Sequence, residues 1–124
     1  MKVIQKICQA KSQSRKMLAL LIDPEKQSSV QTLYPSLSLP DLILVGGSTG
    51  EQCEACVAGL RQYTTSPIVL CPGNIAQFTA KADALLFLSV LTSRQPQLLV
   101  EPHIQMATTI LQSGIETIPM GYLL

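Results

Sequence analysis

Five short apolar runs decide the fold of this 124-residue chain: LALLID at residues 18–23, LILVGGS at 42–48, IVLCPGN at 68–74, ALLFLS at 84–89 and ETIPMGYLL at 116–124. Strands that are buried on both faces are continuously apolar in this way, which is typical of a parallel sheet. The residues able to do chemistry collect just after the apolar stretches. In a β/α barrel, that end of the strands is where active sites are built.

Helix-forming segments separate the apolar runs. We expect helices over residues 2–15, 25–34, 51–63 and 98–112, a short helical connection over 75–81, and a glycine cap at Gly114. Regular strand–helix alternation without a linker predicts right-handed βαβ units in one domain, residues 1–124. A doubly wound sheet and a barrel are both compatible with five such units, and the periodicity alone does not choose between them.

The composition indicates a core but little surface charge. The chain is 47% hydrophobic and 14% charged, whereas about a quarter charged is usual for a soluble domain. The net charge of +1 argues neither for nor against a nucleic-acid partner, and we expect none. Five lysines and arginines precede the first acidic residue, Asp23. They form either the solvated face of an N-terminal helix, the more ordinary case, or a surface attracted to an anionic membrane or substrate, with transient membrane contact.

The four cysteines include one C-x-x-C pair, Cys53 and Cys56, on a segment that we expect to be helical. Without a second pair the spacing is weak evidence for zinc, and it lacks a thioredoxin-like context. We therefore favour buried structural thiols. The N-terminus has no signal-peptide core, and no apolar run reaches the ~18 residues of a membrane span. We expect a cytoplasmic protein with reduced thiols.

Candidate site residues follow the first three runs. Asp23 could hold Mg²⁺, which prefers oxygen ligands, or could cap the next helix, and the spacing favours neither. Ser48 follows Gly46 and Gly47, where a backbone can approach a ligand closely and a hydroxyl can bind metal or phosphate; a tight turn with a capping serine is the more ordinary case. Asn74 could bind an oxygen-rich ligand or serve its turn.

Three polar residues elsewhere carry weaker expectations. Gln77 could also bind an oxygen-rich ligand, and Arg94 either pairs with a phosphate or, as we favour, faces solvent. His103 lies on the helix after the fourth run, where we expect a surface histidine.

Ordered motifs give the chain a family resemblance. They are LLIDPEK at 20–26, VGGS at 45–48, PIVLCPGN at 67–74, KADALLFLS at 81–89, SRQP at 93–96 and ETIPMGYLL at 116–124. In this order they resemble the N-terminal portion of the geranylgeranylglyceryl phosphate synthase family, in the branch of archaea and some bacteria. Leu21 stands where a related bacterial branch has lysine, which places the chain outside that branch.

The resemblance implies a (β/α)₈ barrel that transfers a geranylgeranyl group from its diphosphate to the 3-hydroxyl of sn-glycerol 1-phosphate, with Mg²⁺. By position it makes Asp23 and Ser48 the metal ligands. As substrate-binding positions we name Gly46, Gly47, Asn74 and Tyr122, and we expect a homo-oligomer.

The same resemblance implies an incomplete barrel. A complete one takes roughly 250 residues, so we expect about strands one to five here, with the family's catalytic and glycerol-phosphate residues beyond Leu124. The expected function is therefore this prenyltransferase, inactive or dependent on the remaining half, which could be supplied in trans. The alternative is a non-catalytic half-barrel module that binds a diphosphate or lipid or that oligomerises.

Overall fold

A computed structural model describes residues 1–26, 35–47, 53–73 and 75–124. The elements follow in the order α1 (Val3–Ser12), β1 (Ala19–Ile22), β2 (Leu42–Gly47), α2 (Cys53–Arg61), β3 (Ile68–Pro72), η2 (Ile75–Gln77, a 3₁₀ turn), β4 (Ala84–Val90), α3 (Pro96–Leu99), α4 (Glu101–Ser113) and β5 (Glu116–Tyr122). All five apolar runs are thus strands. The helix expected over 25–34 falls largely outside the described residues.

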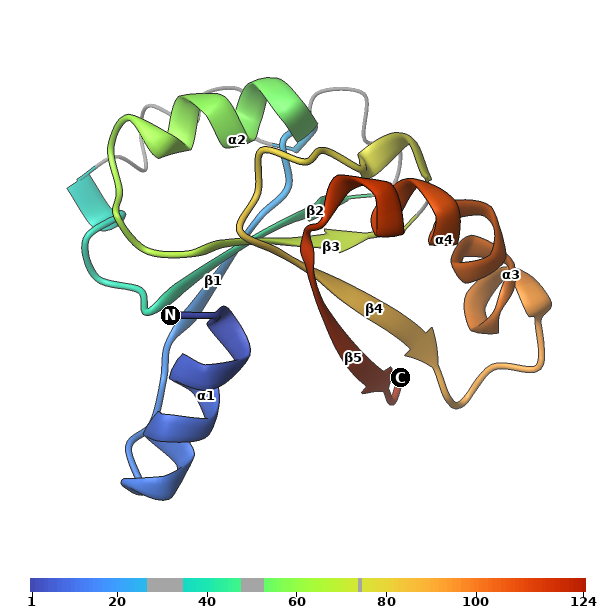
Figure 1. Cartoon of the computed structure of the whole chain (residues 1–124). Coiled ribbons are helices and arrows are strands. Elements are labelled where there is room, and N and C mark those ends of the chain that lie inside the picture. The colour runs from blue at the N-terminus through green and yellow to red at the C-terminus, as the bar shows by residue number, and fades with distance from the viewer. Residues whose placement is uncertain (27–34, 48–52, 74) are drawn as a thin grey trace.

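The five strands form one parallel sheet in the order β1-β2-β3-β4-β5 (Figure 1). Ile22 pairs with Val45, Val45 with Leu70, and Leu70 with Leu85. A doubly wound sheet reverses its strand order at a switch point, whereas each strand of a barrel pairs with the next in sequence. The order therefore resolves the choice in favour of five consecutive units of a barrel-type fold.

Helix boundaries follow local chemistry, with one correction. The expected single helix over 98–112 is divided into α3 and α4, with Val100 between them at φ −130° and ψ −29°. Pro102 explains the break, because in a continuous helix its ring would clash with the carbonyl of Leu98. The expected cap at Gly114 is confirmed, since this residue adopts a left-handed conformation with φ 68° after α4.

Apolar side chains pack on both faces of the sheet. On one face, Ile43, Leu70 and Leu85 pack against α2 and α4 through side chains such as Val57 and Ile110. On the other face a second cluster contains Val3 of α1 with Leu42, Val69, Ala84, Leu86 and Ile118. Figure 1 shows α2, α3 and α4 above the sheet and α1 below it. We call the face under which α1 lies the inner face, because it would face the interior of a closed barrel.

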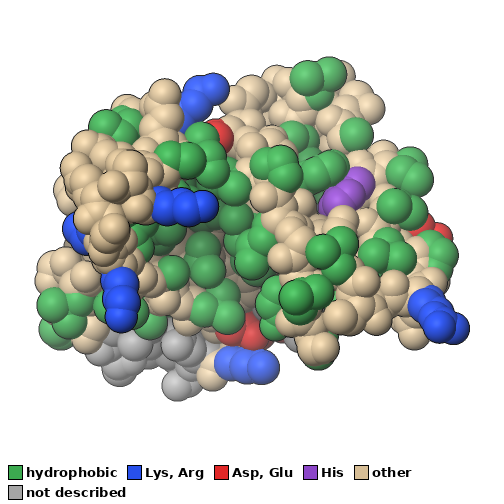
Figure 2. Space-filling model, turned by 90° about the horizontal axis from the view of Figure 1, so that it is seen from below, with side chains coloured by type: hydrophobic (Ala, Val, Ile, Leu, Met, Phe, Trp, Pro, Cys, Tyr) green, Lys and Arg blue, Asp and Glu red, His purple; other side chains and the backbone are tan. Residues whose placement is uncertain are grey.

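The inner face is covered only in part. Alternation along the strands puts Leu21, Met120 and Tyr122 on this face, and they are 58%, 39% and 42% exposed. Figure 2 views the molecule from this side and shows hydrophobic side chains across the middle of the face. Within the described residues, β1 and β5 each pair on one side only. In a closed barrel, layers of side chains fill this space and no strand edge remains.

Candidate functional site

Asp23 is the candidate ligand whose surroundings the structure describes best. It directly follows Ile22, the last residue of β1, and Ile22 pairs with Val45 of β2. The next residues in the ladder are Gly46 and its partner Cys71 on β3. The carboxylate therefore lies at the edge where parallel strands end, which is the edge that carries ligand sites in barrels.

One oxygen of Asp23 is used within its own turn. The backbone N–H of Glu25 donates a hydrogen bond to Oδ1 at 3.0 Å, and Lys26 Nζ lies 3.9 Å from Oδ2. The side chain is 18% exposed, so it is held in place but remains accessible. The capping-type contact and a ligand role are compatible, because the first occupies Oδ1 and the lysine lies at the limit of an ion pair with Oδ2.

Two of the sequence-predicted residues, Ser48 and Asn74, lie outside the described residues. Their described neighbours are Gly47 and Gly73, and Gly47 pairs with Pro72 at the ends of β2 and β3. Burial raises the pKa of the Cys53 thiol at the start of α2, and the negative charges of Glu25 and Asp23 raise it further. The start of α2 therefore lies within the electrostatic reach of Asp23. The predicted metal pair Asp23 and Ser48 thus comes from neighbouring strand ends and stays a prediction.

The residues at this edge fit Mg²⁺ only if substrate phosphates and water supply most of its ligands. Among the described residues, no group of three or more His, Cys, Asp and Glu side chains is placed to hold a metal ion. Mg²⁺ does not need such a cage, since it commonly binds through one or two carboxylates, substrate phosphates and water. Asp23 is a carboxylate of that kind.

Gly46 has a structural role that its sequence context did not reveal. A Cβ atom at this position would lie 2.4 Å from the carbonyl oxygen of Cys71 on the neighbouring strand. Glycine is therefore needed for the close approach of β2 to β3. Whether Gly46 and Gly47 also contact substrate stays a prediction.

Tyr122 is the last residue of β5, and its side chain is 42% exposed on the inner face. Its backbone carbonyl accepts a hydrogen bond from the N–H of Leu91 at 2.8 Å.

The helical pair of thiols is buried, as expected. Cys53 and Cys56 are buried on α2 and are not in a disulfide. Burial raises the pKa of Cys56 to about 11, and burial likewise raises the pKa of the half-buried Cys71. These groups stay protonated at neutral pH, so they are poor nucleophiles.

The outlying polar residues divide between exposure and structure. Arg94 is exposed, as favoured. Gln77 is buried, and its Oε1 accepts a hydrogen bond from the N–H of Gly73, so it supports the turn rather than reaching out to a ligand. His103 is not the surface histidine we expected. Its ring stacks on Phe87 at a centroid distance of 3.8 Å, and its Nε2 lies 2.7 Å from the carbonyl oxygen of Leu88.

The packing of the His103 ring could not be predicted from the sequence, because it depends on how α4 packs against β4. The ring borders an apolar cavity of about 140 Å³ that lies between β4 and the two helices and is also lined by Leu98 and Met106. The cavity opens near the ends of β3 and β4, since Pro72, Gly73 and Val90 also line it. It adds apolar volume to the same end of the sheet as Asp23.

Together, these features define an α/β protein of the parallel barrel type, with a candidate carboxylate site at the carboxyl ends of its strands. Comparison with known proteins then places it more narrowly. The chain belongs to the PcrB family, whose sequence model matches residues 10–124.

Two relatives of this chain share one name. The chain is 41% identical to the geranylgeranylglyceryl phosphate synthase of Zunongwangia profunda, an alignment that covers 99% of this chain and 55% of that protein. It is 38% identical to the synthase of the same name from Methanosphaera stadtmanae, covering 84% and 45%. The synthase from Thermoplasma acidophilum in complex with sn-glycerol-1-phosphate superimposes with a TM-score of 0.86 at 27% identity, covering 99% of this chain and 52% of the other. The chain thus spans about half the length of the relatives it matches.

Proposed function

We propose that this chain supplies one half of a geranylgeranylglyceryl phosphate synthase. In this proposal the complete barrel transfers a geranylgeranyl group from its diphosphate to the 3-hydroxyl of sn-glycerol 1-phosphate. The observation that carries it is the alignment of nearly the whole chain with relatives of that name, with Asp23 at the ligand-binding end of the strands. A relative bound to sn-glycerol-1-phosphate supports the choice of acceptor.

In this proposal Asp23 binds Mg²⁺, and the bound Mg²⁺ would in turn bind the diphosphate. The N–H of Glu25 fixes the carboxylate through Oδ1, and Oδ2, which has Lys26 Nζ 3.9 Å away, is the oxygen proposed to face the metal ion. Ser48, one residue beyond Gly47, is proposed as the second protein ligand. Bound Mg²⁺ would offset the charge that develops on the departing diphosphate. The carboxylate thus orients the leaving group, and its position at the strand ends keeps the reacting carbon at this edge.

Apolar side chains at the carboxyl-end rim of the inner face are proposed to receive the prenyl chain, above the side-chain layers that fill the interior of a closed barrel. Leu21, Met120 and Tyr122 expose apolar surface there, close to the strand ends that carry Asp23. An apolar chain transferred onto such a surface loses contact with water, which contributes about 25 cal/mol per Å² buried. Residues for the glycerol phosphate are assigned to the remaining barrel units, so the isolated chain is expected to bind Mg²⁺–diphosphate and to lack transfer activity.

The test uses calorimetric titration of the chain with inorganic diphosphate, with and without Mg²⁺. We expect Mg²⁺-dependent binding, weakened at least about tenfold in Asp23→Asn because one charged ligand is lost. Glu101→Gln is the matched control, since it removes an exposed carboxylate from the start of α4. Equal affinity in Asp23→Asn and the parent chain would refute the metal-ligand role. Binding that is strong without Mg²⁺ would instead favour the non-catalytic diphosphate-binding module.

A further inference from the structure

The charges of this chain are unevenly distributed along its sequence. Residues 1–22 contain five of the nine lysines and arginines and none of the eight acidic residues, so they carry +5. Residues 23–124 contain the other four cations and all eight anions, so they carry −4. The segment that holds α1 is therefore rich in cations, and it can attract an anionic surface where acidic residues from the rest of the chain do not neutralise it.

The structure leaves the lysines of this segment unneutralised. No ion pair between described residues involves Lys2, Lys6, Lys11 or Lys16. Among the described residues, Arg15 is the cation of this segment that forms an ion pair, with Nη1 2.9 Å from Oδ1 of Asp41. Figure 2 shows Lys and Arg side chains gathered on the side of the inner face where α1 lies.

The nearby anions are already engaged with the protein. Asp41 also accepts the N–H of Leu18 at 2.8 Å. Asp83 pairs with Arg61 at 2.9 Å and accepts the N–H of Ile68. Glu116 accepts two N–H groups of α1. Asp41 and Asp83 are thus each matched by an arginine, and the single charge of Glu116 does not offset those of the four lysines, so this end is positive.

Helical geometry places lysines on both sides of the buried stripe of α1. Val3 and Ala10 are the buried residues of α1, and at about 100° per residue Lys2 and Lys6 lie on one flank of that buried stripe and Lys11 on the other. Lysines on both flanks of an exposed helix face can bury their stems and keep their charges at an interface. The helix can thus lie flat against a charged surface.

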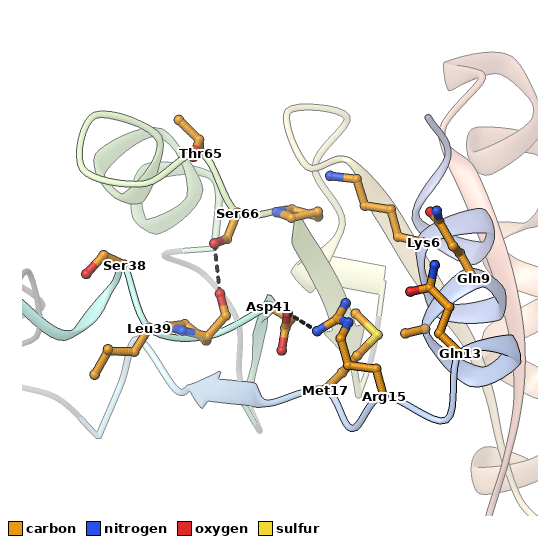
Figure 3. A pocket seen from close by; sticks show the side chains of 13 residues that line it. Lys6, Gln9, Gln13, Arg15, Met17, Ser38, Leu39, Asp41, Thr65 and Ser66 are labelled. Atoms are coloured by element: carbon orange, nitrogen blue, oxygen red, sulfur yellow. Dashed lines mark hydrogen bonds and ion pairs between the residues drawn. The ribbon is translucent and has the colours of Figure 1, made fainter.

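Exposed apolar side chains stand among these cations. Met1, Leu18 and Leu39 are 79%, 58% and 74% exposed, and Ile4 is also exposed on α1. Figure 3 shows the hollow at this end, about 540 Å³ in volume, with Lys6 and Arg15 on one side and Leu39, Ser38 and Ser66 on the other. The hollow adjoins the segments before β1, β2 and β3, at the opposite end of the strands from Asp23.

We propose that this basic end, formed by α1, residues 13–18 and Leu39, docks the protein on an anionic lipid surface. Cations on both flanks of α1 meet lipid phosphates, and Met1, Ile4, Leu18 and Leu39 enter the headgroup region. Each lysine or arginine near such a membrane strengthens binding about fivefold, and salt screens the attraction. The proposed donor and product of the enzyme are lipids, but this docking does not depend on that assignment.

The experiment is co-sedimentation of the chain with vesicles of phosphatidylcholine, with and without phosphatidylglycerol. We expect binding only to the anionic vesicles, lost at high salt. Lys11→Glu with Lys16→Glu changes the charge by four at the basic end and should weaken binding at least about twentyfold. Lys81→Glu with Arg94→Glu makes the same change elsewhere on the surface and should leave more than half of the binding. Lys11→Gln with Lys16→Gln repeats the test with milder substitutions if the reversal disturbs folding.

Two results would overturn the proposal. One is equal binding to neutral and anionic vesicles, and the other is equal loss in the two charge-reversal variants. A further comparison separates a lipid surface from nucleic acid as the partner. If the partner is lipid, Leu39→Ser should weaken vesicle binding several-fold. If RNA displaces the chain from vesicles and Leu39→Ser has no effect on vesicle binding, the surface is assigned to nucleic acid instead. Diphosphate titration of the same variants should be unchanged, which keeps this test independent of the proposed function.

Discussion

At the residue scale, glycines of this chain differ in what surrounds them. A Cβ at Gly46 would overlap the Cys71 carbonyl oxygen at 2.4 Å, whereas a Cβ at Gly59 on α2 meets nothing within 4 Å. A backbone atom on a paired strand cannot move aside cheaply. We therefore expect Gly46→Ala to destabilise the chain by about 1–3 kcal/mol through overpacking.

Gly59→Ala is the matched control for that substitution. It adds a methyl group inside a helix with no steric conflict, so we expect stabilisation of about 0.5–1 kcal/mol. Urea unfolding followed by circular dichroism measures both variants. Stabilisation by Gly46→Ala would show that β2 and β3 are further apart than described.

Asp41 links the stability of the basic end to pH. The hydrogen bond from the Leu18 N–H, followed by that from Arg15, lowers the pKa of its carboxyl below the ordinary value. Because the folded pKa is lowered, the contribution to stability is present above the unfolded pKa of about 3.9 and is lost as pH falls through the folded value. We expect Asp41→Asn to reduce the loss of stability below about pH 4. Thermal unfolding from pH 3 to 6 measures it, and parallel curves for both proteins would contradict the assignment.

At the element scale, the two ends of the sequence are joined through α1. The carboxylate of Glu116, the first residue of β5, accepts the N–H of Val3 at 2.7 Å and that of Ile4 at 2.9 Å. Free N–H groups at a helix start need acceptors, and an anion there is also favoured by the helix dipole. Since α1 has no acidic residue in its first turn, β5 supplies the charge that the helix lacks.

Replacing this carboxylate should loosen α1 selectively. In Glu116→Gln one side-chain oxygen remains, so we expect a loss of about 1–2 kcal/mol in stability. Hydrogen exchange should quicken at the amides of Val3 and Ile4. The amides of α4 serve as the control within the same molecule. Equal acceleration in α1 and α4 would indicate global destabilisation and not the loss of a cap.

At the scale of the whole molecule, the open features are the edges of β1 and β5 and the inner face. Unpaired parallel edges together with exposed apolar residues such as Leu21 and Met120 promote association. We expect the chain to form oligomers at micromolar concentration, as measured by light scattering after size exclusion. A stable monomer across the accessible concentrations would contradict this.

Completion of the barrel should suppress that association and restore chemistry. We expect co-expression with the part of the Zunongwangia profunda relative that follows its aligned half to give a monodisperse complex with prenyl transfer activity. The control is the same segment with the Asp23→Asn chain, which should assemble without activity. Full transfer by the purified chain alone would refute the half-barrel proposal.

The helices around Pro102 show where sequence and structure part. Apolar runs predicted all five strands, although the continuous burial that such runs imply holds mainly for β2 and the first residues of β3 and β4, since most residues of β5 are exposed. The same sequence did not reveal the break between α3 and α4, although Pro102 carried the signal for it. The stacking of His103 on Phe87 had no local signal, since it depends on how α4 meets β4.

By itself, the sequence determined the β/α alternation, the glycine cap at Gly114, the family and the position of Asp23 at a strand end. The tertiary structure decided the strand order, because pairing between strands is a non-local choice that periodicity does not encode, and that order confirmed the barrel-type fold that the family resemblance implied. It also decided that Gly46 is needed between two strands and that Glu116 caps a helix 113 residues away. Contacts of this kind exist only after the chain has folded back on itself.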